Sequence, residues 1–230
     1  TTSSATPFTI TVGDVNEAPV ITGTAESFDE NITGEVVYNL SASDVDGDTL
    51  DYSLSGADAA KFEVIDDGGK KLALRYDKSL DHEAGGYNVT VTVEDDGSSG
   101  HMSDFIDLTI TADDVNEAPT AVTLVGDTIA ENSTVNTVVG TLSATDEDDS
   151  DTHSFTLGGT DSGKFKVIDD NGVKKLALNS GVTLDYEGGT TSYDITVTAT
   201  DSGNETTSSA TPFTITVGDV NEAPVITGTA

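Results

Sequence analysis

Carboxylate side chains recur in short groups along this 230-residue chain, often with one residue between two acids. Three such groups are Asp44-Val-Asp46, Leu80-Asp-His-Glu83 and Asp114-Val-Asn116. Carboxylates that converge without a basic partner repel each other, so they need either protons or a hard cation. Carboxylate, amide and carbonyl oxygens are the ligands that Ca²⁺ prefers. The residue types and their spacing therefore predict calcium sites.

Other metal formats fit the sequence less well. The chain has no Cys and only three His, so zinc is not favoured. On a strand His82 would point away from Asp81 and Glu83, and His101 and His153 are interpreted as ordinary surface residues. Neither an EF-hand loop nor the glycine-rich nonapeptide of parallel β-helices is found.

The composition excludes several classes of protein. With 9 Lys+Arg against 42 Asp+Glu, the net charge is −33, and a surface of this sign repels nucleic acid. Without Cys no disulfides are possible. No apolar run approaches the roughly 18 residues that a transmembrane helix needs, so no membrane insertion is expected in this segment, and no signal-peptide pattern is visible. Intrinsic disorder is rejected because the apolar residues fall into alternating runs.

Alternating apolar and polar residues are the main sign of secondary structure, and they are typical of half-buried antiparallel strands. The clearest runs are Phe8–Val12, Val89–Val93, Phe105–Ile110, Ile195–Ala199 and Phe213–Val217. Shorter runs are Val36–Ala42, Leu50–Leu54, Phe62–Ile65, Leu72–Leu74, Val138–Ala144, Ser154–Leu157, Phe165–Ile168 and Leu176–Leu178. Turn residues such as Asp170-Asn-Gly172 separate them. About seven short strands per hundred residues predict a β-sandwich of immunoglobulin-like build.

The chain is also internally repeated. Thr1–Ala25 and Thr206–Ala230 are identical, and the motifs KFEVIDD and KKLAL of the first half return as KFKVIDD and KKLAL in the second. Repeats of about one hundred residues indicate tandem small domains, and the shared apolar positions are expected to form their cores. The predicted organisation is a C-terminal strand fragment of a preceding repeat at 1–13, repeats at 17–116 and 117–221, and the start of a following repeat at 222–230.

The order of the acidic motifs resembles one family. Each repeat carries E-N, then D-x-D, L-D-x-E, D-x-G and finally D-x-N-E-A-P. This ordered set resembles the cadherin repeat, and in particular the cadherin-like repeats of large bacterial RTX-type surface adhesins. The resemblance implies an all-β fold of tandem antiparallel Greek-key β-sandwich domains, cadherin- or immunoglobulin-like, arranged end to end. It also implies Ca²⁺ between successive domains, with Pro-containing linkers that the metal stiffens.

The resemblance also implies which residues bind Ca²⁺. The central junction would use Glu30, Asp81, Glu83, Asp114, Asn116, Glu117, Asp146, Asp148 and Asp201. A first half-junction would use Asp14, Asn16, Asp44, Asp46 and Asp95, and a last one Glu131, Asp185, Glu187, Asp219 and Asn221. The chain departs from the family pattern at Asp48 and Asp151, which stand where an Asn is usual. It has no Trp, so strand exchange through a Trp anchor is not implied.

Two functional hypotheses remain open. In the first, the chain is a calcium-stiffened extender of a secreted or cell-surface bacterial adhesin, whose partners are Ca²⁺ and neighbouring repeats, with attachment to a host or other surface through further domains. In the second, it is a carbohydrate- or partner-binding module, although few aromatic side chains are present for stacking on sugars. An enzyme is not expected, because the same acid pairs recur in both repeats at predicted strand ends.

Overall fold

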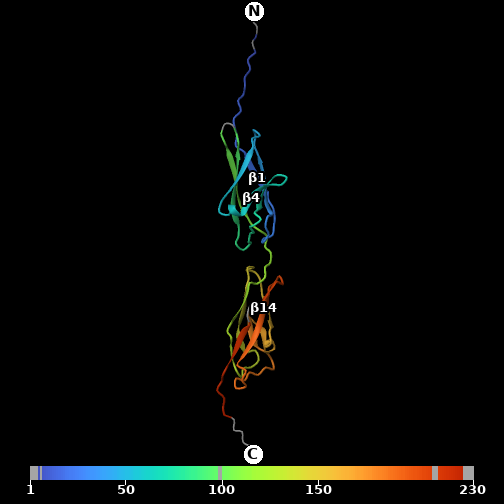
Figure 1. Ribbon diagram of the computed structural model, residues 1–230, viewed down its shortest axis with the longest axis vertical. Coiled ribbons are helices and arrows are strands. Elements are labelled where there is room, and N and C mark those ends of the chain that lie inside the picture. Colours follow the sequence, from blue (N-terminus) through green and yellow to red (C-terminus); the bar gives the residue numbers. More distant parts are fainter. Residues whose placement is uncertain (1–4, 6, 98–99, 209–211, 225–230) are drawn as a thin grey trace, which may run out of the picture. The chain divides into compact units, whose positions relative to one another are not determined.

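The computed structural model describes residues 5, 7–97, 100–208 and 212–224, and the chain divides into two compact units, Thr1–Val115 and Asn116–Ala230. Both units consist of strands, with one short 3₁₀ turn in each, at Ala59–Lys61 and Ser162–Lys164 (Figure 1). In the described part of the chain, no helix has the length and apolar character needed to span a membrane. The predicted all-β fold is confirmed.

Unit 1 is a sandwich of two sheets. Its strands are β1 (Val20–Ala25), β2 (Val36–Ser43), β3 (Leu50–Ser55), β4 (Phe62–Asp66), β5 (Lys70–Leu74), β6 (Tyr87–Asp95) and β7 (Ser103–Ile110). One sheet has the order β1-β2-β5-β4 and the other β3-β6-β7, with antiparallel pairing throughout. Because neighbours such as β2 and β5 are not consecutive in sequence, the chain crosses between the sheets as a Greek key does.

Unit 2 repeats this plan. Its strands are β8 (Ala121–Val125), β9 (Thr128–Ala130), β10 (Val138–Thr145), β11 (Ser154–Gly158), β12 (Phe165–Asp170), β13 (Val173–Leu178), β14 (Ser192–Thr200), β15 (Thr206–Ser208) and β16 (Phe213–Gly218). The sheets have the orders β12-β13-β10-β8 and β11-β14-β16-β9, and β15 pairs with β14. One pair, β16 with β9, is parallel, which the purely antiparallel prediction did not include.

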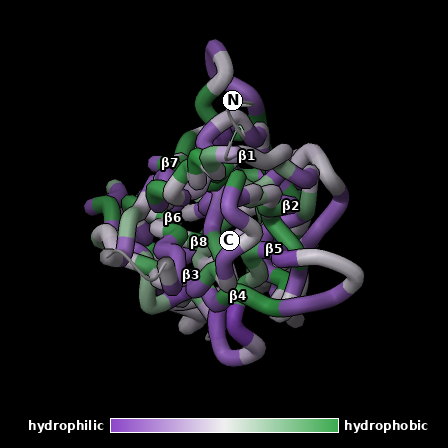
Figure 2. The backbone as a smooth tube through the Cα atoms, turned by 90° about the horizontal axis from the view of Figure 1, so that it is seen from above, coloured by the Kyte–Doolittle hydropathy of each residue, from purple (hydrophilic) through white to green (hydrophobic). Residues whose placement is uncertain are grey.

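Alternating burial along the strands forms the two cores. Strand β6 buries every second residue. Hydrophilic and hydrophobic stretches both occur along the backbone of the strands (Figure 2). In unit 1, Leu72 of one sheet and Val91 of the other are both fully buried in a single cluster, so the sheets pack face to face. Leu176 and Val197 have the same positions in unit 2. The prediction that the apolar positions of the shared KKLAL motif are core is confirmed, since Leu, Ala and Leu are buried in both copies.

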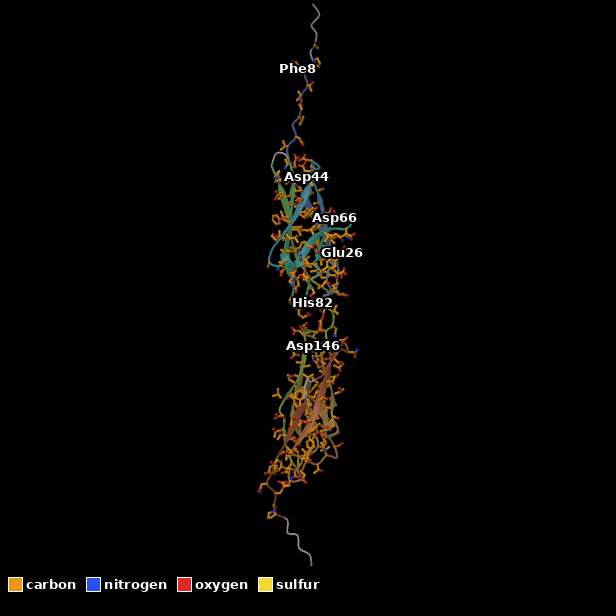
Figure 3. All side chains as sticks on the ribbon, in the orientation of Figure 1. Phe8, Glu26, Asp44, Asp66, His82 and Asp146 are labelled. Atoms are coloured by element: carbon orange, nitrogen blue, oxygen red, sulfur yellow. The ribbon has the colours of Figure 1, made fainter. Side chains whose placement is uncertain are left out.

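The identical segments Phe8–Val12 and Phe213–Val217 differ in structure. In unit 2 the segment lies in β16, where Ile215 and Val217 are buried. Near the start of unit 1 the same residues form no strand and run away from the sandwich, with Phe8 93% exposed (Figures 1 and 3). The predicted strand at 8–12 is therefore wrong for this chain, because no neighbouring strand satisfies its backbone groups. The predicted start of a further repeat lies mostly outside the described residues.

Candidate metal centres

The predicted metal ligands lie at the ends of each sandwich. In unit 1, Asp44 and His82 are at opposite ends, whereas Asp66 lies between them (Figure 3). We call the end that carries Asp44 in unit 1, and Asp146 in unit 2, the N-terminal pole. The C-terminal pole carries Glu30 in unit 1 and Glu131 in unit 2.

At the C-terminal pole of unit 1, the buried Glu30 joins two loops. Its side chain is almost fully buried; Oε2 accepts a hydrogen bond from the His82 backbone N–H at 2.7 Å and Oε1 one from that of Val115 at 3.0 Å. The loop of His82 is anchored by Leu80, which is 1% exposed. After Glu30, Asn31 adopts a left-handed conformation with φ of 60°, which Asn tolerates better than most residues. The E-N and L-D-x-E motifs are thus joined by hydrogen bonds.

Unit 2 has the same arrangement around Glu131. Its carboxylate accepts hydrogen bonds from the backbone N–H groups of Tyr186 at 2.7 Å and Val220 at 2.8 Å. These two bonds, the one from Tyr186 being the stronger influence, lower the pKa of Glu131 below its usual 4.5. Leu184, fully buried, anchors this loop as Leu80 does in unit 1. The side chain thus serves as a structural acceptor as well as a candidate ligand.

The substitution Glu131→Gln is expected to lower the melting temperature of unit 2 by several degrees at pH 7 in EGTA, because the amide can accept only with its one oxygen. The pKa of Glu131 is depressed on folding, so its stabilisation is present above the unfolded pKa near 4.5 and is lost as the pH falls through the lower folded pKa. The difference between wild type and variant should therefore shrink below about pH 4. Calorimetry across pH 3–7 tests this, and a pH-independent difference would contradict it.

The N-terminal pole of unit 1 concentrates three carboxylates. Oxygens of Asp44, Asp46 and Asp48 lie within 4.8 Å of one another. Asp44 Oδ1 accepts the backbone N–H groups of the next turn, including Asp46 at 2.8 Å and Gly47 at 3.1 Å. Its other oxygen, Oδ2, is buried and has no hydrogen-bond partner. Partial burial, and then the charge of Asp44, raise the pKa of Asp48, and the charge of Asp46 raises that of Glu17.

Asp95 and Asn16 complete this pole. Asp95 is 2% exposed; its Oδ1 accepts the N–H groups of Met102 at 3.0 Å and Gly97 at 3.1 Å, and Oδ2 accepts from Asn16 Nδ2 at 3.1 Å. These bonds, led by the one from Met102, lower the pKa of Asp95. The Glu17 N–H donates to Asp46 Oδ2 at 2.9 Å. Asp95 and Asp46 of the N-terminal pole therefore hold the segment that contains Asn16 and Glu17.

The N-terminal pole of unit 2 follows the same pattern. Oxygens of Asp146, Asp151 and Asp201 lie within 4.8 Å of one another. Asp146 Oδ1 and Asp151 Oδ2 are buried without a hydrogen-bond partner. Asn116 Nδ2 donates to Asp201 Oδ2 at 3.3 Å, and the Glu117 N–H donates to Asp148 Oδ2 at 2.9 Å. The first residues of unit 2 are therefore held by its predicted ligands.

At the C-terminal poles the outermost acids also cluster. One ligand atom each of His82, Glu83 and Asp114 in unit 1, and of Glu131, Glu187 and Glu222 in unit 2, lie within 4.8 Å of one another. Partial desolvation, with the charges of Glu30 and Asp114, raises the pKa of Glu83.

Five predicted ligands are not part of the clusters described above: Asp14, Asp81, Asp185, Asp219 and Asn221. Asp81 Oδ1 accepts the Ala84 N–H at 2.9 Å and Asp185 Oδ1 accepts that of Gly188 at 2.8 Å, so both carboxylates close the turn that follows them. Asp219 and Asn221 are exposed or nearly so, and Asp219 contributes charge beside Glu187.

In the described part of the chain, no Lys or Arg side chain forms an ion pair with the acids of these poles. All nine Lys and Arg residues fall within positions 61–78 and 164–175. There they form ion pairs around the β4–β5 and β12–β13 hairpins, such as Lys70 with Asp66 at 3.1 Å and Lys174 with Asp169 at 2.5 Å. Converging carboxylates with unpartnered buried oxygens and no Lys or Arg neighbour suit a hard divalent cation with oxygen ligands. The residues present therefore fit Ca²⁺.

Two sequence-based interpretations of histidine are wrong. The L-D-H-E motif is a turn and not a strand, so His82 does not point away from its neighbours but lies beside Glu83 and Asp114. His153 is not an ordinary surface residue: its side chain is 15% exposed, and Nε2 is 2.7 Å from Asp146 Oδ2. Strand periodicity cannot describe a turn, and the exposure of His153 depends on how β11 packs.

The structure adds four acids to the poles: Glu17, Asp48, Asp151 and Glu222. A signal for them was present in the sequence. Glu17 and Glu222 are the repeat equivalents of Glu117, and Asp48 and Asp151 occupy one position of the D-x-D stretch. Repeat equivalence with Glu117 therefore points to Glu17 and Glu222, and Asp48 and Asp151 stand beside predicted ligands of their own stretch.

Comparison with known proteins agrees with this geometry. Residues 128–218 match the family model of the cadherin domain. The protocadherin-like wing polarity protein stan of Drosophila melanogaster is 30% identical over 217 residues, which cover 86% of this chain and 6% of that protein. Protocadherin alpha-2 of Homo sapiens is 30% identical over 202 residues, which cover 82% of this chain and 20% of that protein.

A solved structure has the same fold. The protocadherin gammaB7 EC3-6 cis-dimer structure matches with a TM-score of 0.67 and 25% identity, over 88% of this chain and 51% of that chain. This chain thus spans only a small part of its curated relatives and about half of that structure. Residues 128–218 therefore match the cadherin domain, and the fold of the chain is that of cadherin domains in tandem.

Proposed function

We propose that this chain is a calcium-rigidified extender segment of a secreted or cell-surface adhesin, in which Ca²⁺ binds between successive domains. Cadherin domains are extracellular, non-enzymatic adhesion domains that bind Ca²⁺ between repeats, and the match of residues 128–218 to that family supports the proposal. The proposal extends this general property to the particular acids of this chain.

The observation that carries the proposal is the separation of charge within each unit. Acids with buried, unpartnered oxygens, Asp44, Asp146 and Asp151, lie at N-terminal poles, whereas every Lys and Arg lies in the hairpin regions. Without a cation these carboxylates repel one another. The charge of Asp46 is the main cause of the raised pKa of Glu17. Partial burial is the main cause of the raised pKa of Asp48, and the charge of Asp44 adds to it. A cation bound there would offset the electrostatic repulsion between these carboxylates and the cost of burying their oxygens, which the protein's own side chains do not offset.

The sequence around Asp114 supports binding between domains. Asp114 belongs to the C-terminal pole of unit 1, and Asn116 belongs to the N-terminal pole of unit 2, with only Val115 between them. Ligands from two domains are therefore tethered within three residues of chain. The proposed central ligands are Glu30, Glu83, Asp114, Asn116, Glu117, Asp146, Asp148 and Asp201, and Asp81 is placed in a supporting role. The remaining predicted ligands would serve the two outer junctions.

The bacterial part of the proposal rests on different grounds. The identity of Thr1–Ala25 with Thr206–Ala230 and the absence of Cys are typical of long repetitive surface adhesins, which use such extenders in attachment and biofilm formation. The matching relatives named above come from a fly and from human. We therefore propose an adhesin extender from the fold and the poles, and a bacterial source from the repeat identity and the absence of Cys.

Ca²⁺ is expected to reduce the conformational freedom of the full chain. Small-angle scattering should show a narrower range of inter-unit distances in 2 mM Ca²⁺ than in EGTA, and a larger mean distance. The reason is that neutralised poles no longer repel and the chain is held in one extended arrangement. The variant Asp114→Asn should lose most of this difference. Asp66→Asn, which removes the same charge from an exposed ion pair, should keep it. Identical curves for wild type with Ca²⁺ and with EGTA would refute the extender function.

A second candidate function, binding of a small ligand such as a glycan, has one observation in its favour. Unit 2 contains a cleft of about 810 Å³ with an apolar lining that includes Leu142, Phe155 and Val173 and a polar rim that includes His153 and Lys174. Its size suits a small molecule. Screening the chain on a glycan array, with Phe155→Ala as control, tests this candidate separately from Ca²⁺.

A further inference from the structure

We propose that His82, Glu83 and Asp114 form a binding site for Zn²⁺ at the C-terminal pole of unit 1, distinct in chemistry from the oxygen-only sites. One ligand atom of each residue lies within 4.8 Å of the other two. The set supplies one imidazole nitrogen and two carboxylates, and all three side chains are exposed to incoming metal. Imidazole suits borderline transition metals, whereas Ca²⁺ prefers oxygen.

The His82 ring is held in an orientation suited to metal binding. Its Nδ1 is 2.7 Å from the backbone carbonyl oxygen of Ala112. A carbonyl only accepts hydrogen bonds, so Nδ1 carries a hydrogen, and Nε2 is the nitrogen whose lone pair a metal can take once its own proton has left. Metal-binding histidines commonly use this arrangement, in which a backbone oxygen fixes both the tautomer and the ring. We therefore assign Nε2 as the coordinating atom.

The two loops that carry the ligands are joined before any metal binds. The Glu30 carboxylate accepts from the N–H of His82 on one loop and from that of Val115, next to Asp114, on the other. The backbone of Asp113 is fixed to the same region, since Glu30 N–H donates to Asp113 O at 3.0 Å and Asp113 N–H donates to Phe28 O at 2.8 Å. The entropy lost on gathering the ligands is thereby reduced.

The distances are compatible with Zn²⁺. With Zn–N and Zn–O bonds of about 2.0–2.2 Å, tetrahedral ligand atoms lie roughly 3.3 Å apart. Ligand atoms now separated by up to 4.8 Å must approach by about 1.5 Å at most. Rotation of the exposed Glu83 and Asp114 side chains supplies this movement without moving the loops. Water would complete the coordination.

Unit 2 provides a natural comparison. Tyr186 occupies the position of His82, on a loop that Glu131 holds through the same two hydrogen bonds. The carboxylates of that pole remain, but the imidazole is absent, so the Zn²⁺ site belongs to unit 1. Glu83 and Asp114 are also proposed Ca²⁺ ligands, so the two metals compete there; titration in Ca²⁺-free buffer tests the Zn²⁺ site whether or not Ca²⁺ binds.

The test is calorimetric titration of ZnCl₂ into the full, chelator-stripped chain in 150 mM NaCl. Wild type should bind one Zn²⁺ about 10-fold or more tightly than the variant His82→Tyr. This variant carries the residue type that unit 2 has at the equivalent position, Tyr186. His101→Gln should retain wild-type affinity. Equal affinity of His82→Tyr and wild type would overturn the proposal, because carboxylates alone would then explain binding.

Two further readouts keep the result independent of folding defects. The His82 ring resonances should shift on Zn²⁺ addition, whereas those of His101 and His153 should not. The variant Tyr186→His should create a second site of similar affinity at the C-terminal pole of unit 2. Shifts confined to His101 or His153, or no added site in Tyr186→His, would count against the assignment.

Discussion

In excess Ca²⁺ the chain is expected to unfold at a temperature roughly 10–20 °C higher than in EGTA. A ligand at about 100 times its dissociation constant stabilises the folded state by about 2.7 kcal/mol per site. For domains of this size, about 1 kcal/mol shifts the melting temperature by roughly 4–8 °C. In the unfolded chain the acids of each pole are far apart, so the unfolded chain binds Ca²⁺ weakly. Binding to the folded state therefore raises the free energy of unfolding by nearly its full amount. Scanning calorimetry at several Ca²⁺ concentrations measures the shift.

The substitution Asp146→Asn should have opposite effects in the two buffers. Asp146 Oδ1 is buried without a hydrogen-bond partner beside Asp151 and Asp201. Removing its charge relieves repulsion, and the Asn side chain can still hydrogen-bond to His153 Nε2 as Asp146 Oδ2 does, so unit 2 should be as stable as wild type or more stable in EGTA. In Ca²⁺ the same variant loses a ligand and should gain much less. Asp66→Asn, in an exposed ion pair, should change neither response. A variant destabilised equally in both buffers would show that the acid is structural and not a ligand.

The largest effect of a single substitution is expected for Leu184→Ala, which should destabilise unit 2 by about 2–5 kcal/mol. Leu184 is fully buried and precedes the turn that contains Tyr186 and Glu187. The backbone N–H of Tyr186 donates to the Glu131 carboxylate. Truncation leaves a cavity under this turn and frees the loop. Urea unfolding followed by circular dichroism measures the loss, and Leu80→Ala should have a similar effect on unit 1.

The same substitution connects packing to metal binding. If Leu184 positions the turn, Leu184→Ala should also weaken Ca²⁺ binding at the C-terminal pole of unit 2 under conditions where the unit is still folded. Val173→Ala, at a position 44% exposed, is the matched control and should leave both properties nearly unchanged. Loss of stability with unchanged Ca²⁺ affinity would show that hydrogen bonds to Glu131 hold the turn without help from the core.

Several features follow from the sequence by itself. Alternation of apolar and polar residues predicts the strands around Val91 and Val197, because strand side chains point to opposite faces. The repeated KKLAL motif identifies Leu72 and Leu176 as core, since two copies of one domain bury the same positions. The acids, the absence of Cys and the order of motifs predict oxygen ligands for Ca²⁺. These features depend on local pattern and residue chemistry.

The tertiary structure decided which of these residues meet. Asp81 and Asp46 both read as ligands, yet Asp81 caps its own turn whereas Asp46 joins a carboxylate cluster. The sequence predicts Glu30 as a metal ligand but not that its side chain is buried between two loops, whose backbone N–H groups donate to it. Residues 8–12 and 213–217 have one sequence, but only the second forms a strand, because only there do β14 and β9 supply hydrogen-bond partners. Pattern determines what a segment can form, and distant neighbours determine whether it does.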